Sequence, residues 1–276
     1  MSLLLIFDTH SGLCNQFYDI ENAIYFCLKY NIQFTFRYCS FRNDNLCSWT
    51  KQPFEKLFDL KPFEEYKLYI DYYKIKDDVN EQNCFNFNGD IRAHQLYPRG
   101  PNTLSTEILD NIISLNKKYV VLVQFWAVYA FRDRTKISKP VAAKNLVSIY
   151  VDLEKKIINN EPYNFIHYRY ESDFTNFFNI KVDPLGVLID RLVFKNNDLK
   201  IYVATSNIKY LPDFNRDIYK NILCKDDYLS EKLNFEELAF IDYMFGINSQ
   251  ECYGHNRSSF STTINSIKGT NNFYAW

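Results

Sequence analysis

The sequence predicts an α/β fold with two Rossmann-type β/α domains that face each other across a cleft. Two patterns lead to this fold class. In the first half, apolar segments at 3–7 and 32–38 are typical of strands and flank a helical pattern at 20–30, which predicts a parallel β-α-β unit. In the second half, short apolar segments alternate with helical patterns. A chain of 276 residues can bury a core in each of two such domains.

Three further segments complete the first half. Residues 119–125 form a continuous apolar run, as expected for a central strand of a parallel sheet. Apolar residues at helical spacing predict a helix over 141–158. Residues 40–101 carry scattered aromatic and charged side chains without a clear period, so we expect loops and helices there.

The second half alternates more regularly. The predicted strands cover residues 164–169, 199–204, 222–224 and 251–253. The predicted helices cover residues 184–193, 235–245 and 258–267. Asn234 is a favourable cap for the middle helix, with Glu236 and Glu237 in its first turn. The change in rhythm separates an N-terminal domain of residues 1–155 from a C-terminal domain of residues 156–276, with the last helix free to pack back on the N-terminal domain.

The composition narrows the classes of partner and compartment. The net charge of -1 gives no electrostatic case for a nucleic-acid partner. The seven cysteines are odd in number and include no Cys-x-x-Cys pair, so we expect free thiols and no metal site. No apolar stretch approaches the roughly 20 residues of a membrane span, and the run at 3–7 is too short for a signal peptide. We therefore expect a soluble, cytoplasmic protein, with a fragment of a longer secretory protein as the alternative.

One predicted strand ends in a run of functional groups. Residues 165–173 are Phe-Ile-His-Tyr-Arg-Tyr-Glu-Ser-Asp. Alternate side chains of an extended chain share a face and lie about 6.5 Å apart. This spacing would gather four polar side chains, namely His167, Arg169, Glu171 and Asp173. Because ligands of open α/β sheets bind at the carboxyl ends of strands, an arginine and a histidine here are suited to one anionic ligand.

Two more segments indicate the same kind of site. Residues 11–16 follow the first strand, where Gly12 allows a tight turn and Asn15 supplies neutral hydrogen-bond donors. Residues 254–261, Gly-His-Asn-Arg-Ser-Ser-Phe-Ser, lead from a turn into a helix. Free backbone N–H groups and serine hydroxyls at a helix N-terminus can bind phosphate, and an ordinary helix cap is the alternative.

Together these segments resemble the O-fucosyltransferase superfamily, which includes protein O-fucosyltransferases, α1,6-fucosyltransferases and the plant O-fucosyltransferase-like and rhamnosyltransferase branch. Residues 12–16 are similar to its first motif, and residues 167–173 to the His-x-Arg-x-Glu-x-Asp pattern of the plant branch. Residues 201–206 resemble the next strand and turn, where many members end on Asp instead of serine. Residues 240–243 and 254–261 resemble the closing motif. The matching residues occur in both halves of the chain, but only in short separate segments.

The resemblance implies a GT-B fold, with an acceptor-side N-terminal domain and a nucleotide-side C-terminal domain. It implies a GDP-sugar donor, usually GDP-fucose, inversion at the anomeric carbon and no metal requirement. We further expect a glycan or protein acceptor and no other cofactor. The sequence agrees with this, because it contains no Asp-x-Asp, Gly-x-Gly-x-x-Gly or Walker motif.

The resemblance and the chemistry together assign roles. Arg169 would neutralise the departing diphosphate in place of a metal ion, because a guanidinium grips phosphate oxygens in pairs. The expected catalytic residues are Arg169, His167 and Asn15. The expected nucleotide-sugar-binding residues are Gly12, Asn15, His167, Arg169, Asp242, Ser258, Ser259 and Phe260, with a local structural role as the alternative for Asp242. The general base stays open among Asp8, His10, Glu171 and none at all.

Two other functions remain as alternatives. A rhamnosyltransferase with another nucleotide-sugar would use the same scaffold. A non-catalytic glycan- or nucleotide-binding protein would keep the fold without the reaction. A phosphohydrolase is a weaker option, because the sequence offers no paired metal ligands and no activated nucleophile.

Overall fold

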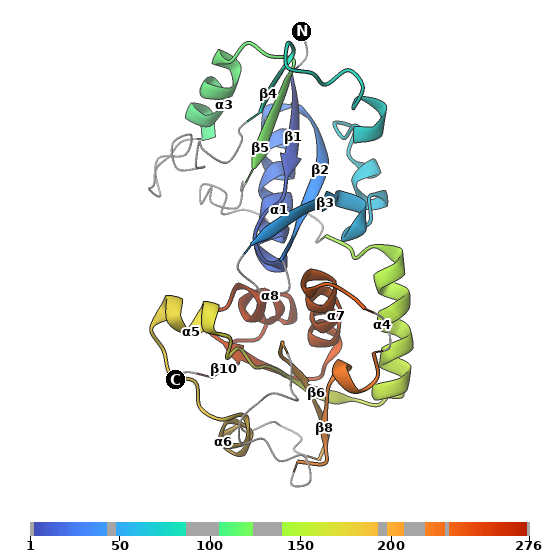
Figure 1. Cartoon of the computed structure of the whole chain (residues 1–276), viewed down its shortest axis with the longest axis vertical. Coiled ribbons are helices and arrows are strands. Elements are labelled where there is room, and N and C mark those ends of the chain that lie inside the picture. The colour runs from blue at the N-terminus through green and yellow to red at the C-terminus, as the bar shows by residue number, and fades with distance from the viewer. Residues whose placement is uncertain are drawn as a thin grey trace. The chain divides into compact units, whose positions relative to one another are not determined.

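The computed structural model describes residues 3–42, 48–86, 105–123, 140–192, 198–206, 219–229 and 232–274. Contacts divide the chain into two compact units, Met1–Ala143 and Lys144–Trp276 (Figure 1). Helix α4, Lys144–Ile157, belongs to the second unit, and each unit is built around its own five-stranded sheet. None of the helices in the described ranges combines the length and the apolar character needed to cross a lipid bilayer.

The first unit holds a sheet with the strand order β3-β2-β1-β5-β4. Its strands are β1 Leu4–Asp8, β2 Gln33–Arg42, β3 Trp49–Pro53, β4 Cys84–Asn86 and β5 Tyr119–Val123. The central strand β1 is buried along its whole length and pairs in parallel with β2 and β5, which confirms the predicted β-α-β unit. Strand β3 pairs antiparallel with β2 at one edge.

Helix α1, Leu13–Tyr30, begins one to two turns before the predicted start and lies against this sheet (Figure 1). Its first turns bury Leu13, Cys14 and Phe17, although polar residues interrupt the apolar pattern there. Burial of one of those polar residues, Gln16, explains why the pattern is hidden in the sequence. Asn31 ends the helix in the left-handed conformation, with a φ of 53°.

The segment expected to be irregular contains two strands, β3 and β4, so that part of the prediction is wrong. Both lie at edges of the sheet and are short, and short edge strands carry little periodic signal. The 3-10 helices η1 Phe54–Lys56, η2 Lys61–Glu65 and η3 Tyr72–Lys74 lie between them. Phe54 stacks on Phe36 and Phe58, with ring centroids 4.8 and 4.7 Å apart, so this segment completes the core. Residues 43–47 and 87–101 of the segment are outside the described part.

At the end of the first unit, one element was not predicted and one predicted strand is present. Helix α3, Ser105–Ser114, has no counterpart among the expected elements. The expected strand over 119–125 is present as β5, and its last two residues lie outside the described part.

The second unit holds a sheet with the order β10-β9-β6-β7-β8, in which every pairing is parallel. Its strands are β6 Tyr163–His167, β7 Lys200–Ala204, β8 Ile222–Leu223, β9 Cys252–His255 and β10 Phe273–Tyr274. The first four confirm the predicted strands, and β10 was not expected. A two-residue edge strand carries too little pattern to be seen in the sequence.

The helices of the second unit cover both faces of its sheet (Figure 1). They are α4, α5 Ser172–Phe178, α6 Leu185–Arg191, η6 Lys225–Asp227, α7 Phe235–Asn248 and α8 Ser259–Lys268. Helix α7 begins with the predicted cap, because Asn234 and Glu237 bond each other's backbone in a capping box. Tyr202 of β7 stacks on Phe245 of α7 at 4.1 Å, whereas α6 packs on the opposite face against Ile166.

Candidate functional site

In the second sheet, the side on which successive strands are added reverses at β6, which makes this strand the centre of the candidate site. From β6 the chain adds β7 and β8 on one side, and then β9 and β10 on the other. The carboxyl ends of β6 and β9 therefore flank a topological switch point, where ligands of open α/β sheets bind. His167 is the last residue of β6, and His255 is the last residue of β9.

His167 is held by the first turn of α8. Its Nδ1 lies 2.8 Å from the Ser261 hydroxyl, and its ring lies 4.5 Å from the ring of Phe260. Burial holds the pKa of His167 well below its usual range, with help from Arg169, Lys225 and His255. The imidazole is therefore neutral at physiological pH, and it can donate one hydrogen bond while accepting another.

Gly254 explains how the first turn of α8 comes so close to β9. A Cβ on this residue would lie well under 3.0 Å from the Cβ and Oγ of Ser261. Only a residue without a side chain leaves room for Ser261, which is itself buried. The sequence pattern predicted a turn at this glycine, whereas in the structure the glycine allows a helix to approach a strand closely.

The N-terminus of α8 keeps its hydrogen-bonding groups available. Ser258 is the N-cap residue, but its side chain makes no cap hydrogen bond. The hydroxyls of Ser258 and Ser259 have no hydrogen-bond partner among the described residues. The first N–H groups of a helix have no partner within the helix, and the helix dipole favours negative charge at this end. This end of α8 is therefore suited to a phosphate, as the sequence predicts.

Arg169 lies beyond the end of β6, so the predicted extension of this strand to residue 169 is wrong. The alternation of side chains along an extended chain stops at His167, and Glu171 is already the N-cap of α5. A turn, and not a strand face, brings the two side chains together: Arg169 Nη1 lies 3.3 Å from Glu171 Oε2. The Arg169 guanidinium also lies over the ring of Phe174 at 5.4 Å. The side chain of Asp173 is outside the described part.

Both side chains of this ion pair are largely shielded, with 15% of Arg169 and 8% of Glu171 exposed. Phe174 also contacts His255 at 5.0 Å, which links the turn after β6 to the end of β9. The Tyr274 hydroxyl of β10 donates to the His167 carbonyl and helps to fix the end of β6.

Asp242 belongs to a buried network that the sequence analysis did not find. Its two carboxylate oxygens accept from Lys225 Nζ at 2.6 Å and from the Tyr202 hydroxyl at 2.8 Å. Lys225 Nζ also donates to the Thr205 carbonyl at 3.1 Å. Burial raises the pKa of Asp242 to about 6, although Lys225 and Tyr202 oppose that rise. These contacts favour the structural alternative for Asp242 over a direct nucleotide contact.

In the first unit, Gln16 fixes the loop that follows β1. Its side-chain oxygen accepts from the Thr9 hydroxyl at 2.7 Å and from the Ser40 backbone at 3.1 Å. Its side-chain nitrogen donates to the carbonyls of Ser11 at 2.9 Å and Ser40 at 2.8 Å. Ser11 has the left-handed backbone, with a φ of 75°, where Gly12 was expected to make the turn. The Gln16 contacts hold this conformation, which costs a residue with a side chain about 1–2 kcal/mol.

The two other predicted residues of this loop are Gly12 and Asn15. Gly12 is the N-cap of α1 in an ordinary extended conformation, and a Cβ there would meet only the end of the Arg42 side chain, at 3.1 Å. Asn15 is partly exposed in the first turn of α1, and its side chain has no hydrogen-bond partner among the described residues. Its amide is therefore available to a ligand.

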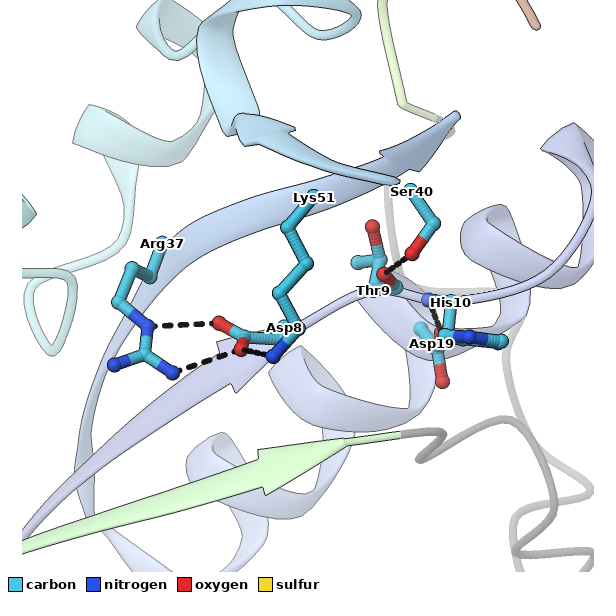
Figure 2. A network of polar contacts seen from close by, with 7 residues as sticks. All are labelled: Asp8, Thr9, His10, Asp19, Arg37, Ser40 and Lys51. Atoms are coloured by element: carbon cyan, nitrogen blue, oxygen red, sulfur yellow. Dashed lines mark hydrogen bonds and ion pairs between the residues drawn. The ribbon is translucent and has the colours of Figure 1, made fainter. Parts of the chain in front are cut away.

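Asp8 and His10 lie in a polar network at the carboxyl end of β1, shown in Figure 2. The Asp8 carboxylate accepts from Arg37 Nε at 2.9 Å, Arg37 Nη2 at 2.8 Å and Lys51 Nζ at 2.9 Å. The His10 backbone N–H donates to Asp19 at 2.8 Å, and its ring lies 5.4 Å from the ring of Trp49. Burial lowers the pKa of His10, and Lys51 adds to this shift.

The structure thus brings the predicted residues together as two sets, one in each unit. The set in the second unit lies around the switch point of its sheet and consists of His167, Arg169, Ser258, Ser259 and Phe260. In the first unit, Asp8 ends β1, and His10, Gly12 and Asn15 follow it. The sequence analysis missed Arg37, Lys51 and Lys225, which are single basic residues with no motif around them. Arg37 gave one weak signal, because it is a charge inside an apolar strand pattern. Within the described ranges, no three His, Cys, Asp or Glu side chains gather in a way that could hold a metal ion.

Comparisons with known proteins bear on the fold. No family model matches the chain, and no curated protein matches it in sequence. Among solved structures, POFUT1 in complex with GDP-fucose gives a TM-score of 0.69 at 10% identity, over 99% of this chain and 98% of that chain. POFUT1 in complex with GDP gives 0.68 at 10% identity, over 100% and 99% of the two chains.

The fucosyltransferase NodZ from Bradyrhizobium is also similar, with a TM-score of 0.58 at 11% identity over 97% of this chain and 93% of that chain. At such low identity the likeness establishes the fold alone. It confirms the predicted α/β, GT-B-like fold class, and it confirms the predicted family resemblance at the level of the fold.

Proposed function

We propose that this protein is a glycosyltransferase that moves fucose from GDP-fucose to an acceptor hydroxyl, with inversion at the anomeric carbon and without a metal ion. The observation that carries the proposal is the set of groups at the switch point of the second sheet. Arg169, a neutral His167 and the N-terminus of α8 are all suited to a diphosphate. The fold shared with POFUT1 and NodZ supports this choice of donor, because those structures were obtained with GDP-fucose or GDP.

The reaction needs a group that stabilises the leaving diphosphate. The acceptor oxygen forms a bond to the anomeric carbon, the bond from that carbon to the phosphate oxygen breaks, and GDP leaves with both bonding electrons. The negative charge that grows on the β-phosphate is met by the Arg169 guanidinium and by the first N–H groups of α8. Preorganised donors of this kind are often the largest single contribution to catalysis.

His167 is proposed as a neutral donor to the same leaving group. Its low pKa keeps it neutral, and Ser261 occupies Nδ1. If the Ser261 hydroxyl donates to Nδ1, the proton of the ring lies on Nε2, from which it could be donated to a ligand. Asn15, on the first unit, would position the donor and the acceptor through its unpaired amide.

Among the three residues named as general base, His10 has the best support. The Asp8 carboxylate is held by two cations, and Glu171 is paired with Arg169. A carboxylate engaged in this way would have to give up its ion pair to take a proton. His10 has a lowered pKa, so its ring is neutral and can accept a proton at physiological pH.

The proposal also covers the acceptor-side role of the first unit, a glycan or protein acceptor, and a cytoplasmic location. The six described cysteines are free thiols, as is usual for proteins of a reducing compartment.

The test is GDP release from GDP-fucose in the presence of EDTA, with wild type, Arg169→Ala and Arg169→Lys. Loss of two charge-assisted hydrogen bonds should lower kcat/KM by about 100-fold or more in Arg169→Ala. The lysine variant keeps the positive charge but loses the paired N–H donors of the guanidinium, so its kcat/KM should lie between those of wild type and Arg169→Ala. Arg191→Ala is the matched control, because Arg191 makes only an exposed ion pair with Asp183.

Other outcomes would change the proposal in defined ways. Equal turnover of wild type and Arg169→Ala would remove Arg169 from the mechanism, and loss of activity with EDTA would overturn metal independence. Turnover of another nucleotide-sugar in a donor panel would favour the rhamnosyltransferase alternative. GDP binding without transfer or hydrolysis would favour the non-catalytic alternative, to which the serine at position 206 lends some weight.

A further inference from the structure

Within the network at the carboxyl end of β1, the group formed by Asp8, Arg37 and Lys51 contains more positive than negative charge. One carboxylate, Asp8, is shared by two permanent cations, Arg37 and Lys51 (Figure 2). A single arginine would already neutralise and hold a buried carboxylate in bidentate geometry. Among the described residues, Asp8 is the one carboxylate that forms an ion pair with either cation. This group of three therefore carries a net charge of about +1.

Both cations keep hydrogen-bond donors that this network does not use. Lys51 Nζ has three N–H donors and, among the described residues, makes one hydrogen bond, to Asp8. Its side chain is 48% exposed. Arg37 uses Nε and Nη2 for Asp8 and one further contact with Tyr72, out of five N–H donors. The two groups are also held in place, because the Arg37 and Lys51 side chains lie 4.8 and 6.0 Å from the ring centroid of Tyr38.

The positive charge reaches the loop that follows β1. Lys51 contributes to the lowered pKa of His10, which lies two residues beyond Asp8. The same loop continues to Asn15, whose amide has no partner among the described residues. The positive charge of Lys51 therefore acts on His10, the residue that the proposed function assigns to the acceptor hydroxyl.

We propose that Lys51 and Arg37 form a subsite for the carboxylate of an acidic sugar, so that the acceptor is a glycan with a uronic-acid residue. A uronic acid carries its carboxylate and several hydroxyls on one ring, so it can reach the cations and the adjoining loop together. The role as acceptor rests on the proposed transferase function, whereas the binding of the acidic sugar does not. Asp8 then has a positioning role, because it holds the two cations side by side.

The experiment measures the binding of methyl glucuronide and methyl glucoside to the full chain by titration calorimetry, at low salt and without any donor. Wild type should bind the glucuronide about tenfold more tightly, as expected for one charge-assisted hydrogen bond. Lys51→Gln should remove this preference and leave glucoside binding unchanged, whereas Lys51→Arg should keep it. Lys51 is chosen because Asp8 retains both of its bonds to Arg37, so the variant is expected to fold.

Lys56→Gln is the matched control, because Lys56 is an exposed lysine of the same unit with no ion pair among the described residues. It should retain the wild-type preference. Higher salt should reduce the preference in wild type and in this control alike. Equal affinity for the two sugars, or a preference that survives in Lys51→Gln, would overturn the inference. Sugar binding that follows this pattern in a chain that releases no GDP would leave the subsite standing and remove the transferase.

Discussion

The carboxyl ends of the two central strands, β1 and β6, use their polar groups differently. In each unit the first strand lies at the centre, with later strands added on both sides. At the end of β1, Gln16 and Asp8 are fully occupied by contacts within the unit. At the end of β6, a neutral histidine and the N-terminus of α8 offer donors with no such partner.

This difference supports the proposal that the leaving group binds at the end of β6. Catalysis gains from donors that are fixed before the charge develops, and donors already paired with a carboxylate cannot contribute as much. The end of β6 fits this requirement because Gly254 and Ser261 hold α8 against the sheet without using the first N–H groups of the helix. The end of β1 is better suited to holding a ligand than to changing its bonds. Four predictions test this contrast.

The largest effect is expected for Asp8→Asn, which would break the ion pairs at the carboxyl end of β1. This change leaves Arg37 without its bidentate partner, and removing one member of a buried ion pair costs about 3–5 kcal/mol. We expect the free energy of unfolding in urea to fall by about 3 kcal/mol, because Lys51 is partly solvated and reduces the penalty. Asp77→Asn, an exposed aspartate of the same unit, is the control. A stability equal to wild type would show that the network is not structural.

The next largest effect is expected for Gly254→Ala, which would disturb the start of α8 at the carboxyl end of the second sheet. The added methyl would clash with Ser261, and overpacking of this kind costs about 1–3 kcal/mol. We expect GDP binding to weaken as well, because the first turn of α8 has to move. Gly254→Ala combined with Ser261→Gly should recover part of the stability, and Gly269→Asn should change little, because asparagine tolerates the left-handed backbone of residue 269. A Gly254→Ala protein with normal stability and binding would contradict the proposed close approach.

A smaller effect is expected for Ser261→Ala, which removes the hydrogen bond to His167 Nδ1. We expect kcat for GDP release to fall by about tenfold with KM nearly unchanged, as for the loss of roughly one hydrogen bond in the transition state. The fall should persist across the pH profile, because the ring stays neutral and only loses its orientation. Ser266→Ala, in an exposed position of α8, is the control. A rise in KM alone would assign Ser261 to ground-state binding.

The smallest effect concerns acid stability and His255. Burial, with Arg257 nearby, lowers the pKa of His255 from 6.5 to about 4. Between these values the unfolded chain binds a proton that the native protein does not, so the free energy of unfolding falls as the pH falls. This loss is absent above pH 6.5 and complete near pH 4. Urea unfolding at several pH values should give a shallower dependence for His255→Phe than for wild type, and equal slopes would argue against the shift.

Much of the second unit could be predicted from the sequence, because its strands are short apolar runs separated by clear helical patterns. The cap of α7 could also be predicted, since Asn234 and Glu237 have the spacing of a capping box. In the first unit, β3 and β4 could not, because a short strand at the edge of a sheet is stabilised by pairing and not by its own pattern.

The candidate site could be predicted in part. Arg169, His167 and the serines at the start of α8 were found because strand ends and helix starts have recognisable sequence signals. The end of β6 was placed too late, because alternation continues in the sequence after the strand has stopped. Lys225 and Lys51 were not found at all, since each meets its carboxylate across more than fifteen residues of chain.

The sequence by itself determined the α/β class, the central strands, and the residue types of the proposed diphosphate site, because these depend on local periodicity and on short motifs. The tertiary structure alone decided which polar side chains are already paired within the protein and which can still bind a ligand. Asp242 and Asp8 are similar residues in the sequence, and both are held by cations in the structure. The physical reason is that the partner of a buried charge is set by packing between distant segments, which no local pattern records.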